Sequence, residues 1–210
     1  DAQVRSELES SFQNGTRESG LPDDEIPKHI AIIMDGNRRY GRLNSTNGHY
    51  EGSRKLLQVC QWCLQEHIPQ LTVFAFSTEN WQRNAAEIDA LMEIIRLYVN
   101  ELRDTAILYK IAVRIHATQP EPIPASIRLA LEQLERETTT DTTTYDDEAK
   151  KLTLNICLSY GSRSEIVATC QTLVANDSAI TEDSIDRALS ISAPDVLIRT
   201  AGEFRLSNFL

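Results

Sequence analysis

The sequence contains only four cysteines in 210 residues, too few for the disulfide framework of a small secreted domain. Cys60 and Cys63 stand three positions apart in a helical pattern, and no second His or Cys pair at zinc-binding spacing follows them. Cys157 lies in an apolar run and Cys170 in another helical stretch. We therefore expect free thiols, mostly buried, in a reducing compartment.

Long apolar runs and basic residues are also scarce. No stretch of 18 apolar residues occurs, so we expect no membrane-spanning helix within these residues. The 21 Lys and Arg stand against 31 Asp and Glu, a formal net charge of −10 at pH 7. This balance disfavours binding of nucleic acid or anionic lipid through overall charge, and we expect no nucleic-acid partner. A polyanionic ligand would need a local basic cluster.

Glycine-rich nucleotide-binding signatures are missing as well. The chain has neither Gly-x-Gly-x-x-Gly nor a Walker loop, which leaves an unrelated nucleotide-binding α/β protein without support. The composition is that of a globular protein, with 41% hydrophobic and 25% charged residues. The length fits one domain of ordinary size.

The apolar pattern predicts a single α/β domain that follows a flexible, polar N-terminal arm over residues 1–26. Strands are predicted over 29–34, 71–76, 111–115, 152–158 and 196–198, and helices over 49–67, 85–106, 125–137, 163–175 and 181–190. Because strands and helices alternate, we expect a mainly parallel central sheet with helices on both faces, over residues 27–210.

Polar clusters follow three of the predicted strands, where ligands bind in parallel α/β sheets. They span Asp35–Tyr40, Ser77–Arg83 and Arg199–Asn208. Arginine forks suit diphosphate, and an aspartate beside glycine suits Mg²⁺ that is also held by phosphate oxygens. Each feature alone is more typical of a turn or a solvated surface than of a site. Their recurrence at three strand ends is what favours a site.

The residues in these clusters resemble the motifs of the cis-prenyltransferases, the undecaprenyl and dehydrodolichyl diphosphate synthase family. Met34 to Tyr40 resembles the family's Met-Asp-Gly-Asn-x-Arg signature, and Gly48-His49-x-x-Gly52 resembles its second motif. The stretches 76–83, 155–163 and 195–208 resemble three further motifs in the same order. The likeness covers residues 27–210.

The resemblance implies a Mg²⁺-dependent prenyltransferase of the undecaprenyl diphosphate synthase-like fold. Such an enzyme condenses isopentenyl diphosphate with an allylic diphosphate (dimethylallyl, geranyl or farnesyl) and forms a Z double bond. It also implies a homodimer, or a heteromer with a subunit of the same fold. We expect a cytoplasmic location, or peripheral contact with the endoplasmic reticulum membrane through the product.

The resemblance also assigns roles to residues. Asp35 is the expected metal and diphosphate anchor, and Asn80 the candidate proton-handling side chain. The expected substrate-binding residues are Gly36, Asn37, Arg38, Arg39, Tyr40, Arg42, His49, Ser77, Thr78, Glu79, Trp81, Arg83, Arg199, Arg205, Leu206 and Ser207. Among them, Arg199, Arg205 and Ser207 match the clamp for isopentenyl diphosphate, and the stretch 36–39 matches the cradle for the allylic diphosphate. The expected wall of the product tunnel includes Leu91, Ile95 and Val113.

Two departures from the family pattern carry expectations of their own. Ser45 stands where the family has an arginine, so either Arg42 substitutes or residues are missing between Leu43 and Gly48. The chain also stops at Leu210, before the family's second metal-binding acid, and we expect the natural protein to continue.

Two other functions on the same fold stay open. One is irregular, lavandulyl-type coupling of two allylic diphosphates, which the motifs do not distinguish from chain elongation. The other is a non-catalytic partner subunit, although such subunits typically lose the aspartate and arginines that this chain keeps at 35, 39, 199 and 205. The Asp-Asp-x-x-Asp motif of the all-α trans synthases is absent.

The cysteine spacing yields a first prediction. Protein dialysed against a chelator should retain all four thiols in reduced form and contain no stoichiometric zinc, because Cys60 and Cys63 lack two further ligands. Metal analysis together with a thiol titration under denaturing conditions measures both quantities. Tightly held zinc at one equivalent per chain would contradict this reading of the pair.

Overall fold

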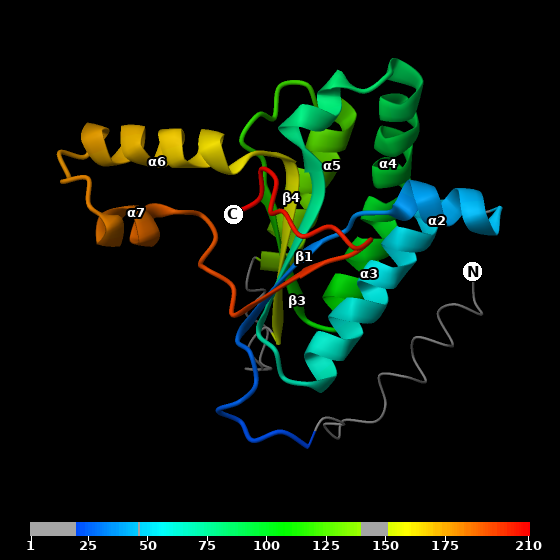
Figure 1. Cartoon of the computed structure of the whole chain (residues 1–210), viewed down its shortest axis with the longest axis horizontal. Coiled ribbons are helices and arrows are strands. Elements are labelled where there is room, and N and C mark those ends of the chain that lie inside the picture. The colour runs from blue at the N-terminus through cyan, green and yellow to red at the C-terminus, as the bar shows by residue number, and fades with distance from the viewer. Residues whose placement is uncertain (1–19, 46, 140–150) are drawn as a thin grey trace.

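The computed structural model describes residues 20–45, 47–139 and 151–210, and their elements follow the predicted alternation (Figure 1). The elements are β1 (His29–Ile33), α2 (Asn37–Asn44), α3 (Gly48–Gln65), β2 (Gln70–Ser77), the 3₁₀ helix η1 (Thr78–Gln82), α4 (Ala85–Leu108), β3 (Ile111–His116), α5 (Ala125–Thr139), β4 (Leu152–Tyr160), α6 (Ser162–Ala175), α7 (Glu182–Ala188) and β5 (Val196–Arg199). Over these ranges the chain is one α/β domain with five strands and six α-helices, which confirms the predicted fold class.

The five strands form one parallel sheet in the order β3-β4-β2-β1-β5. In β1, Ile33 pairs with Phe74 of β2 on one side and with Arg199 of β5 on the other. The carboxyl ends of these three strands therefore lie side by side, although β5 comes last in the sequence. This order brings the three polar clusters to one edge of the sheet.

Helices α3, α4 and α5 cover one face of the sheet, and their apolar stripes form the main core (Figure 1). Its buried helical residues include Leu57 of α3, Leu102 of α4 and Leu134 of α5, each at most 2% exposed. Helix α3 packs against β2 and β4, while α4 and α5 pack against β3, so the three helices spread across this face.

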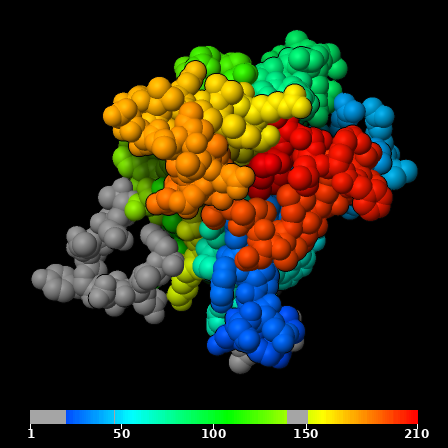
Figure 2. Space-filling model, turned by 60° about the vertical axis from the view of Figure 1, so that its left-hand side comes forward, coloured from blue at the N-terminus to red at the C-terminus, as the bar shows by residue number. Residues whose placement is uncertain are grey.

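The opposite face is covered by the start of α6 and by the C-terminal segment. Phe209 stacks on Phe74 at 4.7 Å and contacts Tyr160 edge to face. Asn208 accepts a hydrogen bond at its carbonyl from the Ser162 amide, 3.1 Å away. In the space-filling view the red C-terminal segment lies between α6 and α7 on one side and blue α2 on the other (Figure 2). The polar cluster Arg199–Asn208 therefore lies beside the polar cluster Asp35–Tyr40.

The observed elements differ from the predicted ones mainly in two short polar helices. The segments of α2 and η1 were predicted only as polar clusters, because neither carries an apolar stripe, and Gly41 is the one buried residue of α2. Ile26, predicted as the end of the polar arm, is 6% exposed and belongs to the main core. Residues 1–19 of that arm lie outside the described ranges. None of the described helices has the length and apolar character needed to cross a bilayer.

Two glycines of α3 bring this helix against the start of α2. A Cβ atom at Gly48 would lie 1.8 Å from the Asn37 carbonyl oxygen and 2.8 Å from the Gly41 amide nitrogen. At Gly52 it would lie 2.6 Å from the side-chain amide nitrogen of Asn37. The first contact is with backbone, which cannot rotate away, whereas the second is with the end of a side chain. Gly48 therefore positions α2 through backbone contact, and Gly52 leaves room for the Asn37 side chain.

A second prediction follows from this contact. Gly48→Ala should destabilise the protein by about 1–3 kcal/mol, because α2 must move away from α3. Gly52→Ala is the matched control on the same helix, and its cost should be smaller, since Asn37 can change rotamer and alanine favours a helix by up to about 1 kcal/mol. Urea unfolding of both variants measures the difference. Equal stabilities would show that the Gly48 contact is not tight in solution.

Candidate functional site

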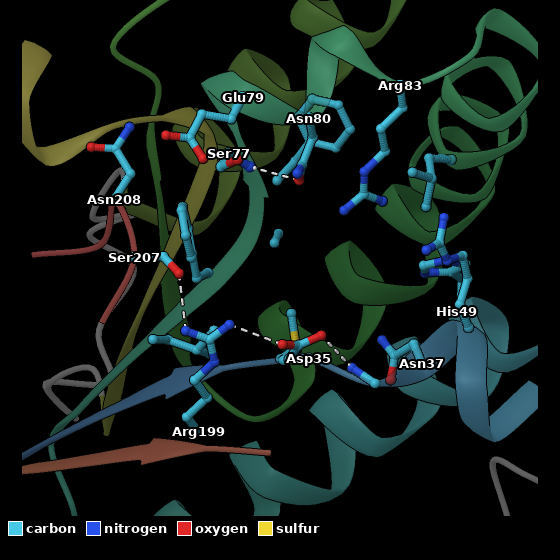
Figure 3. Close-up of a pocket in the computed structure, with 18 of the residues that line it drawn as sticks. Asp35, Asn37, His49, Ser77, Glu79, Asn80, Arg83, Arg199, Ser207 and Asn208 are labelled. Carbon is cyan, nitrogen blue, oxygen red and sulfur yellow. Dashed lines mark hydrogen bonds and ion pairs between the residues drawn. The ribbon is translucent and has the colours of Figure 1, made fainter. Parts of the chain in front are cut away.

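A cleft of about 350 Å³ lies at the carboxyl ends of β1, β2 and β5 (Figure 3). It brings together most of the predicted site residues, namely Asp35, Gly36, Asn37, Arg38, Arg39, His49, Ser77, Glu79, Asn80, Arg83, Arg199 and Ser207. The carboxyl edge of the parallel sheet is where such a fold binds its ligands. The cleft is thus the candidate site.

At the base of the cleft, Asp35 and Arg199 form an ion pair between the ends of β1 and β5 (Figure 3). Arg199 Nη2 donates to Asp35 Oδ2 at 2.9 Å, and Arg199 Nη1 donates to Ser207 Oγ at 3.0 Å and to the Arg205 carbonyl. The Gly36 amide donates to Asp35 Oδ1 at 2.7 Å. The hydrogen bond from Arg199 lowers the pKa of Asp35, so the carboxylate is ionised at neutral pH.

The first turn of α2 forms one side of the cleft. Gly36 precedes it with φ of +89°, a left-handed conformation that favours glycine, and a Cβ there would lie 2.7 Å from Ala201 Cβ. Arg39 Nη2 donates to the Ala201 carbonyl at 3.3 Å. This turn thus presents backbone amides beside Arg38 and Arg39, an arrangement that suits an anionic group.

Helix η1 forms the opposite side, and reciprocal capping holds it in place. The Ser77 amide donates to Asn80 Oδ1 at 3.0 Å, while the Ser77 side chain accepts from the Asn80 amide. Asn80 therefore lines the cleft with its oxygen already engaged. Glu79, on the same short helix, also lines the cleft and brings a carboxylate to this side (Figure 3).

Arg38 of α2 and Arg83, which follows η1, share one carboxylate. Arg38 Nη1 lies 3.0 and 2.9 Å from the two oxygens of Glu87, and Arg83 Nη1 lies 2.9 Å from Glu87 Oε1. Glu87 belongs to the first turn of α4, whose cap residue Asn84 accepts from the Glu87 amide at 2.9 Å. Glu87 was missed from the sequence, since a glutamate in a helical first turn is typical of ordinary helices.

Two buried nitrogens at the cleft have no hydrogen-bond partner among the described residues: His49 Nε2 and Arg199 Nε. Burial lowers the pKa of His49, and the nearby Arg83 lowers it further, so the ring is neutral at pH 7. A buried nitrogen without a partner carries a desolvation cost that a ligand oxygen would relieve.

An apolar cavity of about 120 Å³ adjoins the cleft. Both are lined by Met34, Asn37, His49, Ala75, Phe76 and Leu91. Beyond these shared residues the cavity runs between α3, α4 and α5, past Ile95, Tyr98 and Leu102. The predicted wall residues Leu91 and Ile95 do line it. Val113 is not among the lining residues, because β3 is an edge strand and β4 supplies Ile156 and Leu158 instead.

Six predicted residues are not among those that line the cleft: Tyr40, Arg42, Thr78, Trp81, Arg205 and Leu206. Trp81 packs on Phe76 with ring centroids 4.7 Å apart and donates to Ser159 Oγ at 2.8 Å. Arg205 pairs with Glu203, and Arg42 is exposed on α2.

Asn208, by contrast, lines the cleft although it was not predicted as a binding residue. His116 contacts Asn155 and Ser190 at 3.0 and 3.2 Å.

The fold and the site define an α/β protein with an arginine-rich cleft that opens onto an apolar cavity. Residues 33–210 match the family model for undecaprenyl diphosphate synthase. The chain belongs to this family of cis-prenyltransferases and is a prenyltransferase.

Relatives and solved structures agree with this assignment. The geranylgeranyl-diphosphate-specific tritrans,polycis-undecaprenyl-diphosphate synthase of Thermococcus kodakarensis is 38% identical over 199 residues, covering 88% of this chain and 72% of the relative. An isoprenyl transferase of Fusobacterium nucleatum is 37% identical over 194 residues, covering 90% and 80%. Lavandulyl diphosphate synthase from Lavandula x intermedia, solved with dimethylallyl diphosphate, superposes with a TM-score of 0.78 at 25% identity, covering 90% and 84%. The family identifies the chain as a cis-prenyl diphosphate synthase.

The Asp35–Arg199 pair yields a third prediction. Asp35→Ala should lower prenyltransferase kcat by roughly 10²–10³-fold or more, because the cleft loses its central carboxylate and Arg199 loses its partner. The exposed Asp104→Ala on α4 is the matched control and should leave kcat unchanged. Circular dichroism and thermal unfolding check that Asp35→Ala remains folded. A folded Asp35→Ala protein with normal activity would show that catalysis does not require Asp35.

Proposed function

We propose that this chain is a Mg²⁺-dependent cis-prenyl diphosphate synthase that condenses isopentenyl diphosphate with an allylic diphosphate to give a Z-prenyl diphosphate. The observation that carries the proposal is the junction of the polar cleft with the apolar cavity, through shared residues that include His49 and Leu91. A prenyl diphosphate has the same two parts, a dianionic or trianionic head and a hydrocarbon tail. The head would lie among the arginines and the tail would extend between α3 and α4.

Two groups of donors would hold two diphosphates. Arg39 and the first turn of α2 would hold the allylic diphosphate, beside Asp35. Arg199 and Ser207 at the end of β5 would hold isopentenyl diphosphate, where the unpartnered Nε of Arg199 could donate to a phosphate oxygen. Because β1 and β5 are adjacent, the two heads would lie close enough for their carbon chains to react.

The proposed reaction forms one carbon–carbon bond for each carbon–oxygen bond broken. The allylic C1–O bond breaks and its electron pair leaves with pyrophosphate, while the double bond of isopentenyl diphosphate attacks C1 through C4. Loss of a proton from C2 then restores a double bond. Negative charge grows on the leaving group, so fixed guanidinium and amide donors lower the barrier electrostatically. Asn80 and the neutral His49 line the cleft as candidates for handling the proton.

The donor set at the cleft fits Mg²⁺. This ion prefers oxygen ligands and is usually bound by one or two carboxylates together with substrate phosphates and water. Asp35 supplies an ionised carboxylate whose oxygens each have a remaining lone pair after bonding Arg199 and Gly36. The described residues contain no cluster of three or more His, Cys, Asp or Glu side chains placed to hold a metal. When bound, the ion would neutralise charge on the leaving pyrophosphate.

Irregular coupling of two allylic diphosphates is a second candidate, because lavandulyl diphosphate synthase has the same fold. The relatives at 37–38% identity, named as undecaprenyl-diphosphate synthase and isoprenyl transferase, favour chain elongation.

Product analysis separates these functions. The purified chain is incubated with Mg²⁺ and dimethylallyl, geranyl or farnesyl diphosphate, with and without labelled isopentenyl diphosphate. Labelled Z-prenyl products, formed only when isopentenyl diphosphate is present, would support elongation. A product from dimethylallyl diphosphate alone would identify irregular coupling. No product from the folded chain alone, with activity restored by a second subunit, would support a partner role.

The two arginine groups yield a fourth prediction. Arg39→Ala should raise KM chiefly for the allylic diphosphate, and Arg199→Ala chiefly for isopentenyl diphosphate. Loss of a charge-assisted hydrogen bond to phosphate should change the affected KM by roughly tenfold or more. Steady-state kinetics with each substrate varied in turn measures both constants. Equal effects on the two KM values in both variants would argue against separate diphosphate sites.

A further inference from the structure

We propose that Glu87 is a positioning residue that holds Arg38 and Arg83 in a diphosphate-binding arrangement, an inference that rests on the proposed function. Arg38 and Arg83 come from different elements and both line the cleft. Glu87 is not among the described residues that line the cleft, but it forms ion pairs with both arginines. Glu87 therefore acts on a ligand through the two guanidiniums.

The burial of the three side chains supports this role. The Glu87 side chain is 17% exposed, whereas those of Arg38 and Arg83 are 56% and 35% exposed. Two guanidiniums that converge on one carboxylate repel each other, and a long exposed arginine loses rotamer freedom when it is held in place. A carboxylate between them offsets the repulsion and restricts both side chains before a ligand arrives. Such restriction lowers the entropic cost of binding.

The hydrogen bonds leave donors available for a ligand. Both bonds from Arg38 leave through Nη1, and the bond from Arg83 also leaves through Nη1. The pairing therefore does not use the Nε and Nη2 donors of either guanidinium. A phosphate group can still accept from these nitrogens, since an arginine fork presents donors on more than one edge.

Glu87 itself is fixed by the start of α4. Its amide bonds to the Asn84 side chain at 2.9 Å, and a carboxylate in the first turn of a helix is favoured by the helix dipole. The rigid helix thus determines where the two arginines lie relative to His49. The ion pair between Arg38 and Glu87 thus connects α2 to the start of α4.

The proposal can be tested because it predicts the opposite change in anion affinity from the one that charge alone would cause. Removing a negative charge near an anion site should strengthen anion binding by charge alone. Removing a positioning residue should weaken it. We expect Glu87→Gln to raise the dissociation constant of inorganic pyrophosphate, measured by calorimetry, by roughly 10- to 100-fold. Glu93→Gln, which removes a comparable ion pair on the exposed side of α4, is the matched control and should change it by less than about twofold.

A second variant separates the effect of the ion-pair geometry from the effect of the negative charge. Glu87→Asp keeps the carboxylate but is one methylene shorter, so it should also weaken pyrophosphate binding. Unfolding curves establish that each variant is folded, and if Glu87→Gln does not fold, Glu87→Asp decides the question. Wild-type affinity or tighter binding in a folded Glu87→Gln protein, or wild-type affinity in Glu87→Asp, would overturn the proposal.

Kinetics provide an independent readout. In the active enzyme, Glu87→Gln should raise KM for the allylic diphosphate by a larger factor than it lowers kcat, whereas a general loss of stability would leave KM unchanged. If the wild-type chain forms no prenyl product, the proposed function fails, but the pyrophosphate titration still decides the role of Glu87. The two outcomes are therefore distinguishable.

Discussion

The ion pair between Asp35 and Arg199 is the contact on which the site depends. It joins residues 164 positions apart, at the ends of two neighbouring parallel strands. The same guanidinium also bonds to Ser207 and to the Arg205 carbonyl, so the C-terminal segment is held over the end of β1. Because the Arg199 side chain is only 10% exposed, its charge needs a partner, and Asp35 supplies one.

Next to this ion pair, a polar cleft adjoins an apolar cavity. The cleft brings guanidiniums and amides together in an acidic protein, while the adjoining cavity is lined almost entirely by apolar side chains of α3, α4 and the central strands. His49 lies where the two meet, half-buried and neutral, and its buried Nε2 has no partner among the described residues. An amphiphilic ligand satisfies both environments at once, which is the physical basis for assigning a prenyl diphosphate to this site.

Carboxylates paired with arginines also shape the cleft. Glu87 lies behind Arg38 and Arg83, just as Asp35 lies beside Arg199, so guanidiniums on both sides are paired before a substrate binds. The glycines at 48 and 52 have a related effect, since they let α3 approach the carbonyl and amide of Asn37. The geometry of α2 thus follows from packing and ion pairing, because Gly41 is its one buried residue.

The residues alone were sufficient to predict the alternation of strands and helices, the parallel sheet and most of the cleft. Buried strands and amphipathic helices have strong local patterns, and the three polar clusters follow strand ends directly. Only the tertiary structure decided that β5 lies next to β1, that Trp81 turns to Ser159, and that β4 rather than β3 lines the cavity. It also revealed Glu87, whose partners come from α2 and from the residue after η1. Local patterns determine elements, but contacts between distant segments depend on strand order, which local periodicity does not encode.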